Sequence, residues 1–248
     1  MWLALALGCL AVQLAVLGLL AYGGLALRKF EAPARPPRRP WPAVSVIVAA
    51  RDEAPGIEAA MRSLLALDYA ALEVLAVDDR SSDATGAILD RLAAQDPRLR
   101  VQHVRQLPPG WLGKNHALAL GAREARGELL LFTDADVEFA PQALRSAVAI
   151  LEAEALDHLA LGPGLRLPGA WLAACVAYFA RLFYVYLRPW RARDPRSAAF
   201  IGVGAFNLVR AEGYRAAGGH ERLALRPDDD VKLGKLIKRA GLRQELRH

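Results

Sequence analysis

Cysteine is almost absent from the sequence, since only Cys9 and Cys175 occur among 248 residues and they share no motif. We therefore do not expect a disulfide framework, and the composition fits a reducing compartment. Zinc-finger spacings, basic-aromatic RNA-binding motifs and internal repeats are missing as well. The formal net charge of +6 is compatible with anionic lipid or a phosphorylated small molecule, and nucleic acid is not an expected partner.

Charge is also missing from the N-terminal stretch. Trp2–Leu27 contains no charged residue, and Gln13 is its only strongly polar side chain. This run is long enough to cross a bilayer core of about 30 Å. A cleaved signal peptide is the alternative, but it usually has basic residues before a shorter apolar run of about 7–15 residues. No basic residue precedes this run, so we predict that residues 1–27 form a transmembrane anchor.

A basic, proline-rich segment follows the apolar run at residues 28–43. Its basic residues predict that this end of the anchor is cytoplasmic, and its prolines predict a stiff extended spacer. We therefore expect a single-pass protein of the cell (inner) membrane, with residues 44–248 as a cytoplasmic domain. The basic residues are Arg28, Lys29, Arg35, Arg38 and Arg39, and the prolines are Pro33, Pro36, Pro37, Pro40 and Pro42.

Short apolar runs alternate with amphipathic segments in the first half of this domain. The pattern predicts right-handed βαβ units and a mostly parallel sheet, which is an α/β, Rossmann-like fold. The expected strands are 44–50, 72–79, 99–104 and 128–134, and the expected helices are 55–67, 84–94 and 114–126. Beyond residue 137 we expect helices at 141–154 and 229–240, strands near 158–165 and 198–209, and an apolar, aromatic-rich segment at 170–187.

Acidic residues follow three of the predicted strands, as Arg51-Asp52-Glu53, Asp78-Asp79 and Asp134-Ala135-Asp136. Aspartates often cap helices at such positions, but ligands of open α/β sheets bind at the carboxyl ends of the strands. Asp134 and Asp136 would point the same way if the strand geometry continued, and their like charges repel. The pair therefore indicates a site for a hard divalent cation.

The common nucleotide-binding fingerprints are missing. No G-x-G-x-x-G follows the first strand, and "PPGWLGKNHALALG" lacks the glycine spacing and the Ser/Thr of a P-loop. A dinucleotide-dependent dehydrogenase is therefore not expected. Lys114 begins a predicted helix, whose N-terminus favours anions, so it is either a phosphate-binding residue or a solvated lysine.

Four motifs in order resemble those of a family 2 glycosyltransferase with the GT-A fold. They are "VSVIVAARDE", "VDDRSSDAT", "GKNHALALGAREARGELLLFTDADV" and "AGGHERLALRPDDDVKLGKLIKRAG", and the resemblance covers Val44–Leu242. The stretch "GWLGKNHAL" further resembles the hopene-associated or carotenoid-type branch. The resemblance implies a nucleotide-binding half at 44–137 and an acceptor half at 138–248.

The resemblance also implies a role for each motif residue. Glu53 and Asp79 would contact the nucleoside of a UDP- or GDP-sugar, and Lys114 would lie near the base or the diphosphate. Asp134 would approach the ribose or a metal-bound water, and Asp136 would bind Mg²⁺ or Mn²⁺. Asp230 would be the catalytic base, and the loop Gly218-Gly219-His220 would help to form the acceptor side.

This chemistry agrees with the residue types. A metal held by carboxylates stabilises the charge that forms on a diphosphate leaving group, and one carboxylate takes the proton of the acceptor hydroxyl. A nucleophilic carboxylate is unnecessary if the displacement is direct, so the resemblance implies inversion. The acidic triplet Asp228-Asp229-Asp230 also suits a helix N-terminus, where one carboxylate would favour the helix dipole.

The sequence departs from the family pattern at several positions. Ala49 and Asp52 replace a common Pro and Asn, and Asp229 stands in place of Glu. The Q-x-x-R-W motif of processive members is absent, and the chain ends six residues after Leu242. We therefore expect either a compact non-processive enzyme or a truncated one. The alternative function is a catalytically inactive, membrane-bound nucleotide-sugar binding protein.

Two other enzyme classes fit less well. A nucleotidyltransferase needs a glycine-rich loop after its first strand, which "ARDEAPG" does not supply. A haloacid-dehalogenase-like phosphatase carries D-x-D on its first strand, whereas here the motif follows the fourth strand.

The aromatic-rich segment Ala170–Leu187 predicts a lipid or polyisoprenoid alcohol as acceptor. It is apolar except for Arg181, and aromatic residues of this kind favour the headgroup region of a membrane. A buried core helix and a second transmembrane span are the alternatives. The segment 229–240 carries lysines beside apolar residues, so we expect it also to lie on an anionic membrane.

Overall fold

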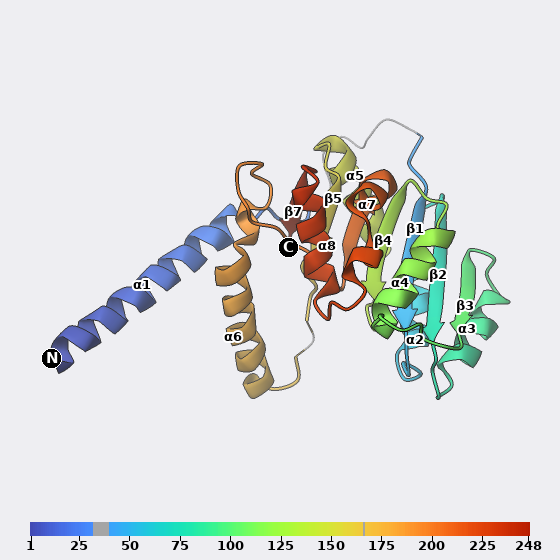
Figure 1. The fold of residues 1–248 in the computed structure, drawn as a ribbon, viewed down its shortest axis with the longest axis horizontal. Helices are drawn as coiled ribbons and strands as arrows, with labels where there is room; N and C mark the ends of the chain where they lie inside the picture. Colours follow the sequence, from blue (N-terminus) through green and yellow to red (C-terminus); the bar gives the residue numbers. More distant parts are fainter. Residues whose placement is uncertain (32–39, 166) are drawn as a thin grey trace.

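The computed structural model describes residues 1–31, 40–165 and 167–248, so the predicted spacer at 28–43 lies partly outside the described residues. At its centre is a seven-stranded sheet in the order β3-β2-β1-β4-β6-β5-β7 (Figure 1). The strands are β1 (Val44–Ala50), β2 (Leu72–Asp79), β3 (Leu99–Val104), β4 (Leu129–Asp134), β5 (His158–Leu161), β6 (Asn207–Arg210) and β7 (Gln244–Arg247).

The parallel part of the sheet brings the acidic strand ends together. β1 pairs in parallel with β2 on one side and with β4 on the other. Ala50 lies opposite Asp78, and Ala49 lies opposite Asp134, so the three strands end at the same edge. All residues of β1 except Ala49 are buried, as their apolar, β-branched character predicts.

The second half of the sheet is mixed. β6 runs antiparallel between β4 and β5, whereas β5 and β7 are parallel. The prediction of a mostly parallel α/β sheet is confirmed, but two strand predictions are too long. β5 ends at Leu161, and the segment before Asn207 is a loop that packs against the start of a later helix.

Helices cover both faces of the sheet, which gives three layers (Figure 1). One face of the sheet, with Val46 and Leu131, packs against α2 (Ile57–Leu65), α3 (Thr85–Ala93) and α5 (Ala143–Ala153). The other face, with Ile47 and Leu130, packs against α4 (Gly113–Glu124), α7 (Ala211–Ala217) and α8 (Asp229–Arg239).

The prediction that α8 lies on a membrane is wrong for its apolar side. Leu233 and Ile237 are fully buried in the core that α8 shares with the sheet. Lys238 donates hydrogen bonds to the carbonyls of Ala192 and Asp194, and Lys235 lies over the Phe200 ring. The apolar side of α8 therefore faces the core. A helix face that packs on the core has the same sequence pattern as a helix face that lies on a membrane.

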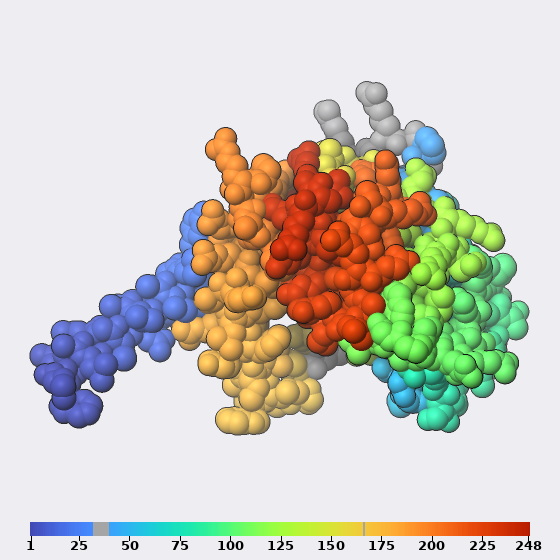
Figure 2. All heavy atoms as spheres, in the orientation of Figure 1, coloured from blue at the N-terminus to red at the C-terminus, as the bar shows by residue number. Residues whose placement is uncertain are grey.

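Two apolar helices lie outside these layers (Figures 1 and 2). α1 (Trp2–Ala26) projects away from the domain, and α6 (Ala170–Leu187) runs along its flank. Both are long and apolar enough to cross a membrane, and each buries a single residue, Gly23 in α1 and Leu187 in α6. The alternative of α6 as a buried core helix is therefore excluded.

α1 and α6 contact one another and the domain near their C-terminal ends. Arg181 of α6 donates a hydrogen bond to Gln13 of α1 at 3.1 Å. Gly23 faces Trp190, and a Cβ atom at position 23 would lie only 2.5 Å from its ring. The close contact requires glycine, and it fixes the end of α1 beside the domain.

Ion pairs join the end of α1 to the sheet. Arg28 forms a parallel bridge with Arg247 of β7 and contacts Glu154 at 2.5 Å. Arg193 and Arg247 also donate to Glu154. Burial alone would raise the pKa of Glu154, but the three arginines outweigh it and lower that pKa to about 2. This cluster holds the end of α1 against the edge of the sheet that β7 forms.

Candidate active site

The residues predicted for nucleotide and metal binding share one cavity at the carboxyl ends of β1, β2 and β4. This first cavity has a volume of about 400 Å³. The structure thus brings together the five side chains to which the resemblance gave a nucleotide or metal role. They are Glu53, Asp79, Lys114, Asp134 and Asp136. Its wall contains Ala49, Ala50, Arg51, Glu53, Asp79, Gly113, Lys114, Asp134, Ala135 and Asp136.

Glu53 is held by a tight connection between the loops that follow β1 and β2. Its backbone N–H donates to the Thr85 hydroxyl at 2.8 Å, and the Ser82 N–H donates to the Asp52 carboxylate at 2.7 Å. Partial burial, and then the charges of Asp136 and Asp134, raise the pKa of Glu53 above its ordinary value. The three carboxylates therefore interact across the cavity.

Asp79 is buried at the end of β2, and Arg80 holds both of its oxygens. The Arg80 guanidinium donates to the two oxygens at 2.8 and 2.9 Å. A Cβ atom at position 113 would lie 2.0 Å from Asp79 Oδ2, so this approach requires Gly113. Arg80 was not among the predicted site residues. The only indication of its role in the sequence is its position directly after Asp78-Asp79.

The aspartate pair at the end of β4 has oxygen chemistry that fits a divalent cation. Within the described ranges, no group of three or more acidic, histidine or cysteine side chains could hold a metal by itself. Asp134, Asp136 and Glu53 nevertheless line one wall, and the two aspartates help to raise the pKa of Glu53. Carboxylate oxygens are the ligands that Mg²⁺ and Mn²⁺ prefer. The donor set therefore fits a cation that also takes ligands from a bound diphosphate.

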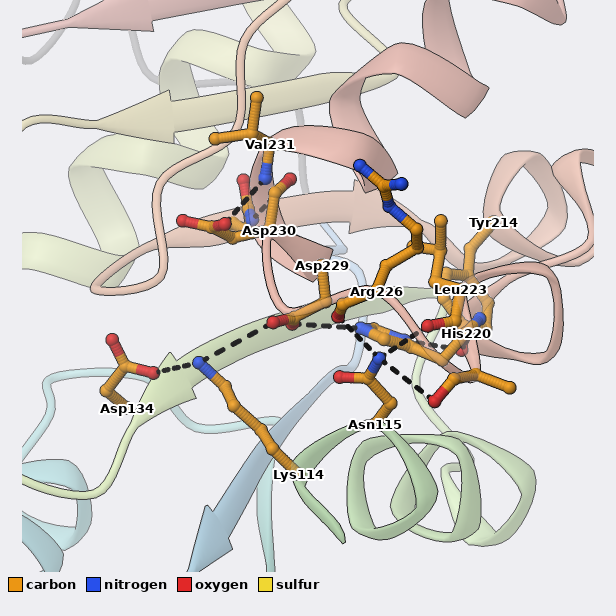
Figure 3. A network of polar contacts seen from close by, with 12 residues as sticks. Lys114, Asn115, Asp134, Tyr214, His220, Leu223, Arg226, Asp229, Asp230 and Val231 are labelled. Carbon is orange, nitrogen blue, oxygen red and sulfur yellow. Dashed lines mark hydrogen bonds and ion pairs between the residues drawn. The ribbon is translucent and has the colours of Figure 1, made fainter. Parts of the chain in front are cut away.

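Lys114 connects this pair to the start of α8 (Figure 3). Its Nζ lies 2.6 Å from Asp134 Oδ1 and 4.0 Å from Asp229 Oδ1. Burial alone would lower the pKa of Lys114, but Asp229 and Asp134 outweigh it and raise that pKa. Lys114 therefore stays a cation between two carboxylates from different elements.

His220 supports Asp229 from inside the protein (Figure 3). The histidine is buried, its Nε2 lies 3.7 Å from Asp229 Oδ2, and its Nδ1 is 2.9 Å from Tyr214 Oη. The loop Gly218-Gly219-His220 was predicted to help form the acceptor side. The structure places its His220 side chain beneath the N-terminus of α8.

Asp230 occupies a narrow crevice beside Asp134 and Gly204. Burial, with a smaller contribution from Asp229, raises the pKa of Asp230, although the Val231 and Gly204 N–H groups and Lys114 act in the opposite direction. A Cβ atom at position 202 would lie 1.8 Å from the Asp230 carbonyl oxygen, so Gly202 allows the loop to reach α8. The loop that sequence analysis took for a strand thus forms one wall around Asp230.

A second cavity of about 730 Å³ shares Asp134 and Asp136 with the first. The sequence did not predict it, because its wall joins residues from both ends of the chain. The wall contains Phe30, Asp134, residues 136–140, Ala143, residues 161–165, Val203, Ala205, Phe206 and His248.

The fold is that of the GT-A glycosyltransferases. The family model for glycosyl transferase family 2 matches residues 45–165. A mannosyltransferase from Pyrobaculum calidifontis, solved with GDP-Man and Mn²⁺, is 27% identical with a TM-score of 0.68; the alignment covers 96% of this chain and 64% of that one. Together with the motifs at the strand ends, these matches support a family 2 glycosyltransferase.

Two curated relatives extend the comparison. The beta-monoglucosyldiacylglycerol synthase of Synechocystis sp. is 38% identical over 111 residues, which are 44% of this chain and 23% of that protein. The 4,4'-diaponeurosporenoate glycosyltransferase of Staphylococcus haemolyticus is 25% identical over 205 residues, which are 80% of this chain and 52% of that protein. The chain thus spans less than a quarter of the first relative and about half of the second.

Proposed function

We propose that the protein is a membrane-anchored, metal-dependent, inverting glycosyltransferase. It moves a sugar from a UDP- or GDP-sugar to a hydroxyl group of a lipid or isoprenoid acceptor. One observation carries this proposal: Asp134 and Asp136 lie on the walls of both cavities. A donor bound in the first cavity would therefore present its sugar to an acceptor in the second.

Glu53 and Asp79 hold the nucleoside end of the donor in this proposal. Both are carboxylates on the wall of the first cavity, and Asp79 is fixed by Arg80 and by the close approach of Gly113. Buried acceptors of this kind take N–H groups of a base or hydroxyl groups of a ribose. Lys114 sits at the N-terminus of α4, where its ammonium and the helix dipole both favour a diphosphate.

Asp134 and Asp136 are the residues that would hold Mg²⁺ or Mn²⁺. The bound cation would stabilise the negative charge that forms on the diphosphate leaving group. Lys114 contributes to the same end, because its charge lies beside Asp134 at the position where the diphosphate would bind.

Asp230 acts as the general base. Its raised pKa makes it a better proton acceptor than an ordinary aspartate. It shares its crevice with Asp134, so it can face an acceptor hydroxyl that approaches the sugar from the second cavity. Direct displacement by that hydroxyl inverts the anomeric carbon.

Membrane association supports a lipid acceptor. α1 and α6 present exposed apolar surfaces, including Trp171 and Phe179 of α6. The two relatives reported above are, by name, a beta-monoglucosyldiacylglycerol synthase and a 4,4'-diaponeurosporenoate glycosyltransferase. We propose that α1 crosses the inner membrane once and that residues 44–248 lie in the cytoplasm, with 44–137 binding the nucleotide and 138–248 the acceptor.

Donor hydrolysis in the absence of an acceptor tests the enzymatic part of this proposal. We expect slow release of UDP or GDP that needs Mn²⁺ or Mg²⁺ and stops with EDTA. The Asp230→Asn variant should bind the donor but turn it over more slowly. Binding of the donor without any turnover would instead identify a nucleotide-sugar binding protein, and binding of no UDP- or GDP-sugar would refute the proposal.

A further inference from the structure

We propose that the second cavity binds the hydroxyl end of an uncharged lipid, and this inference rests on the function proposed above. The cavity reaches from the aspartate pair to the junction between α1 and the sheet. Asp134 and Asp136 line one part of it, and Phe30 and His248 line another. The Phe30 N–H donates to the His248 carbonyl at 2.7 Å, which joins the segment after α1 to the C-terminal end of the chain.

The walls of the cavity continue into both apolar helices. Phe30 lies four residues after Ala26, the last residue of α1. Residues 161–165 form another wall and lead along the chain towards α6, and Leu165 is 58% exposed. A lipid whose head lies in the cavity can therefore extend its chains along apolar surface towards the membrane.

Part of the lining of this cavity is apolar. Val137, Phe139 and Phe206 contribute apolar surface, and Phe139 and Phe206 pack with ring centroids 5.9 Å apart. A volume of about 730 Å³ is within the range of cavities that bury a small ligand, about 300–1,000 Å³. A nucleotide-sized polar ligand would leave these walls without matching groups, whereas a lipid head with its first methylene groups would bury them.

The charge of the lining selects among lipid acceptors. Asp134, Asp136 and Glu138 all border this cavity. A phosphate or diphosphate headgroup would meet Glu138 even if a cation neutralised the aspartate pair, and like charges repel. An uncharged hydroxyl headgroup, as in diacylglycerol or a hydroxylated isoprenoid, carries no such penalty and can donate its proton to a carboxylate.

Photochemical labelling of the full chain in phosphatidylcholine vesicles tests this inference. The probe is a diacylglycerol with a diazirine close to its glycerol end, and peptide mass spectrometry locates the label. We expect labelling within residues 137–143 and 161–165. Ala143→Trp narrows the cavity from the start of α5 and should reduce this labelling by about fivefold or more.

Two further variants separate occlusion from misfolding. Ala153→Trp adds the same side chain at the exposed, opposite end of α5 and should leave the labelling unchanged. Gly164→Phe adds a side chain where a Cβ atom meets nothing within 4 Å, and it should reduce labelling as Ala143→Trp does. Thermal melting of each variant reports whether its fold is retained.

A photoreactive polyprenyl phosphate is the competing probe. The inference is overturned if this phosphate labels the cavity as strongly as the diacylglycerol does. It is also overturned if the diacylglycerol labels only α6, or if Ala143→Trp and Gly164→Phe stay folded and label normally. Metal-dependent donor hydrolysis by the unmodified chain is measured in parallel, so failure of the labelling and failure of the proposed function give different results.

Discussion

Lys114 and Asp134 form a 2.6 Å ion pair between the start of α4 and the end of β4 (Figure 3). The two residues are 20 positions apart and lie on the wall of the same cavity. The pair gives Asp134 a cationic partner in the absence of any donor. It also places an ammonium where a diphosphate would meet the aspartate pair.

Replacing Lys114 by methionine should weaken donor binding. The change keeps most of the side-chain volume but removes the charge that faces the diphosphate. We expect the affinity for a UDP- or GDP-sugar to fall by about tenfold or more, as for the loss of a charge-assisted contact. Titration calorimetry measures this, and Lys235→Met, on α8 over Phe200, is the matched control. Unchanged donor affinity in Lys114→Met would show that this lysine only holds Asp134 in place.

Asp136→Ala should abolish metal-dependent donor binding. Asp136 lies two residues after Asp134, the last residue of β4, and both carboxylates line the first cavity. Calorimetry with and without Mn²⁺ checks this expectation, and Asp68→Ala, which breaks an ion pair with Arg145, serves as control. A variant that keeps its metal-dependent affinity would rule out the metal-binding role of Asp136.

Asp230→Asn should keep donor affinity but slow sugar transfer by at least about 10²-fold, the usual scale for loss of a general base. The amide has nearly the same volume as the carboxylate, so it leaves the crevice beside Gly204 filled. Single-turnover transfer assays separate this step from donor binding.

Asp229→Asn is the natural comparison for that variant. Asp229 faces Lys114 and His220 in the structure, so its loss should disturb donor binding through Lys114. If Asp229→Asn slows transfer more than Asp230→Asn does, the catalytic base has been assigned to the wrong aspartate.

Because His158 is buried, we expect the free energy of unfolding to decrease in mild acid. This histidine is fully buried in β5 beside Asn207, and burial lowers its pKa to about 4. Between pH 6.5 and 4 the unfolded chain therefore binds more protons than the folded chain at this residue. The contribution of His158 to the free energy of unfolding is present above pH 6.5. It is lost as the pH falls, by roughly 3 kcal/mol over this window. Thermal melting at pH 7 and pH 5 measures the change, and His158→Asn should reduce the difference.

His103 provides the control, because its shift has the opposite sign. Hydrogen bonds to Asp78, at 2.9 Å, and to Asp90 raise its pKa above the ordinary value. Its contribution to stability is fully present below pH 6.5 and is lost as the pH rises through the raised pKa. His103→Gln should therefore leave the loss between pH 7 and pH 5 in place. If His158→Asn and His103→Gln show the same change in melting temperature between pH 7 and pH 5, neither histidine governs this pH dependence.

The first half of the fold could be predicted from the sequence, because local periodicity carries the information there. The runs that became β1 and β4 are buried on both faces, and this gives an apolar pattern that few other elements share. Parallel strands joined by helices must end at one edge, so the grouping of Glu53, Asp79 and Asp134 also followed. The apolar character of α1 was equally evident from its composition.

The second half was predicted less well, because its elements depend on partners that are distant in sequence. Residues 201–205 have the composition of a strand, yet they form a loop in which Gly202 packs against Asp230 of α8. β7 is short and polar in sequence, and it forms because β5 offers a parallel edge and Arg28 pairs with its end. Local propensity is overridden in both places by tertiary contact.

The sequence by itself determined the apolar helices, the parallel core and the set of acidic residues at the strand ends, because each depends on neighbours along the chain. Only the tertiary structure decided that Arg80 pairs with Asp79, that Lys114 joins Asp134 to Asp229, and that α8 faces the core. It alone decided the second cavity, whose walls bring Phe30 and His248 to the same space as Asp136. These features depend on distances between residues far apart in the chain, which folding sets and which local sequence patterns do not encode.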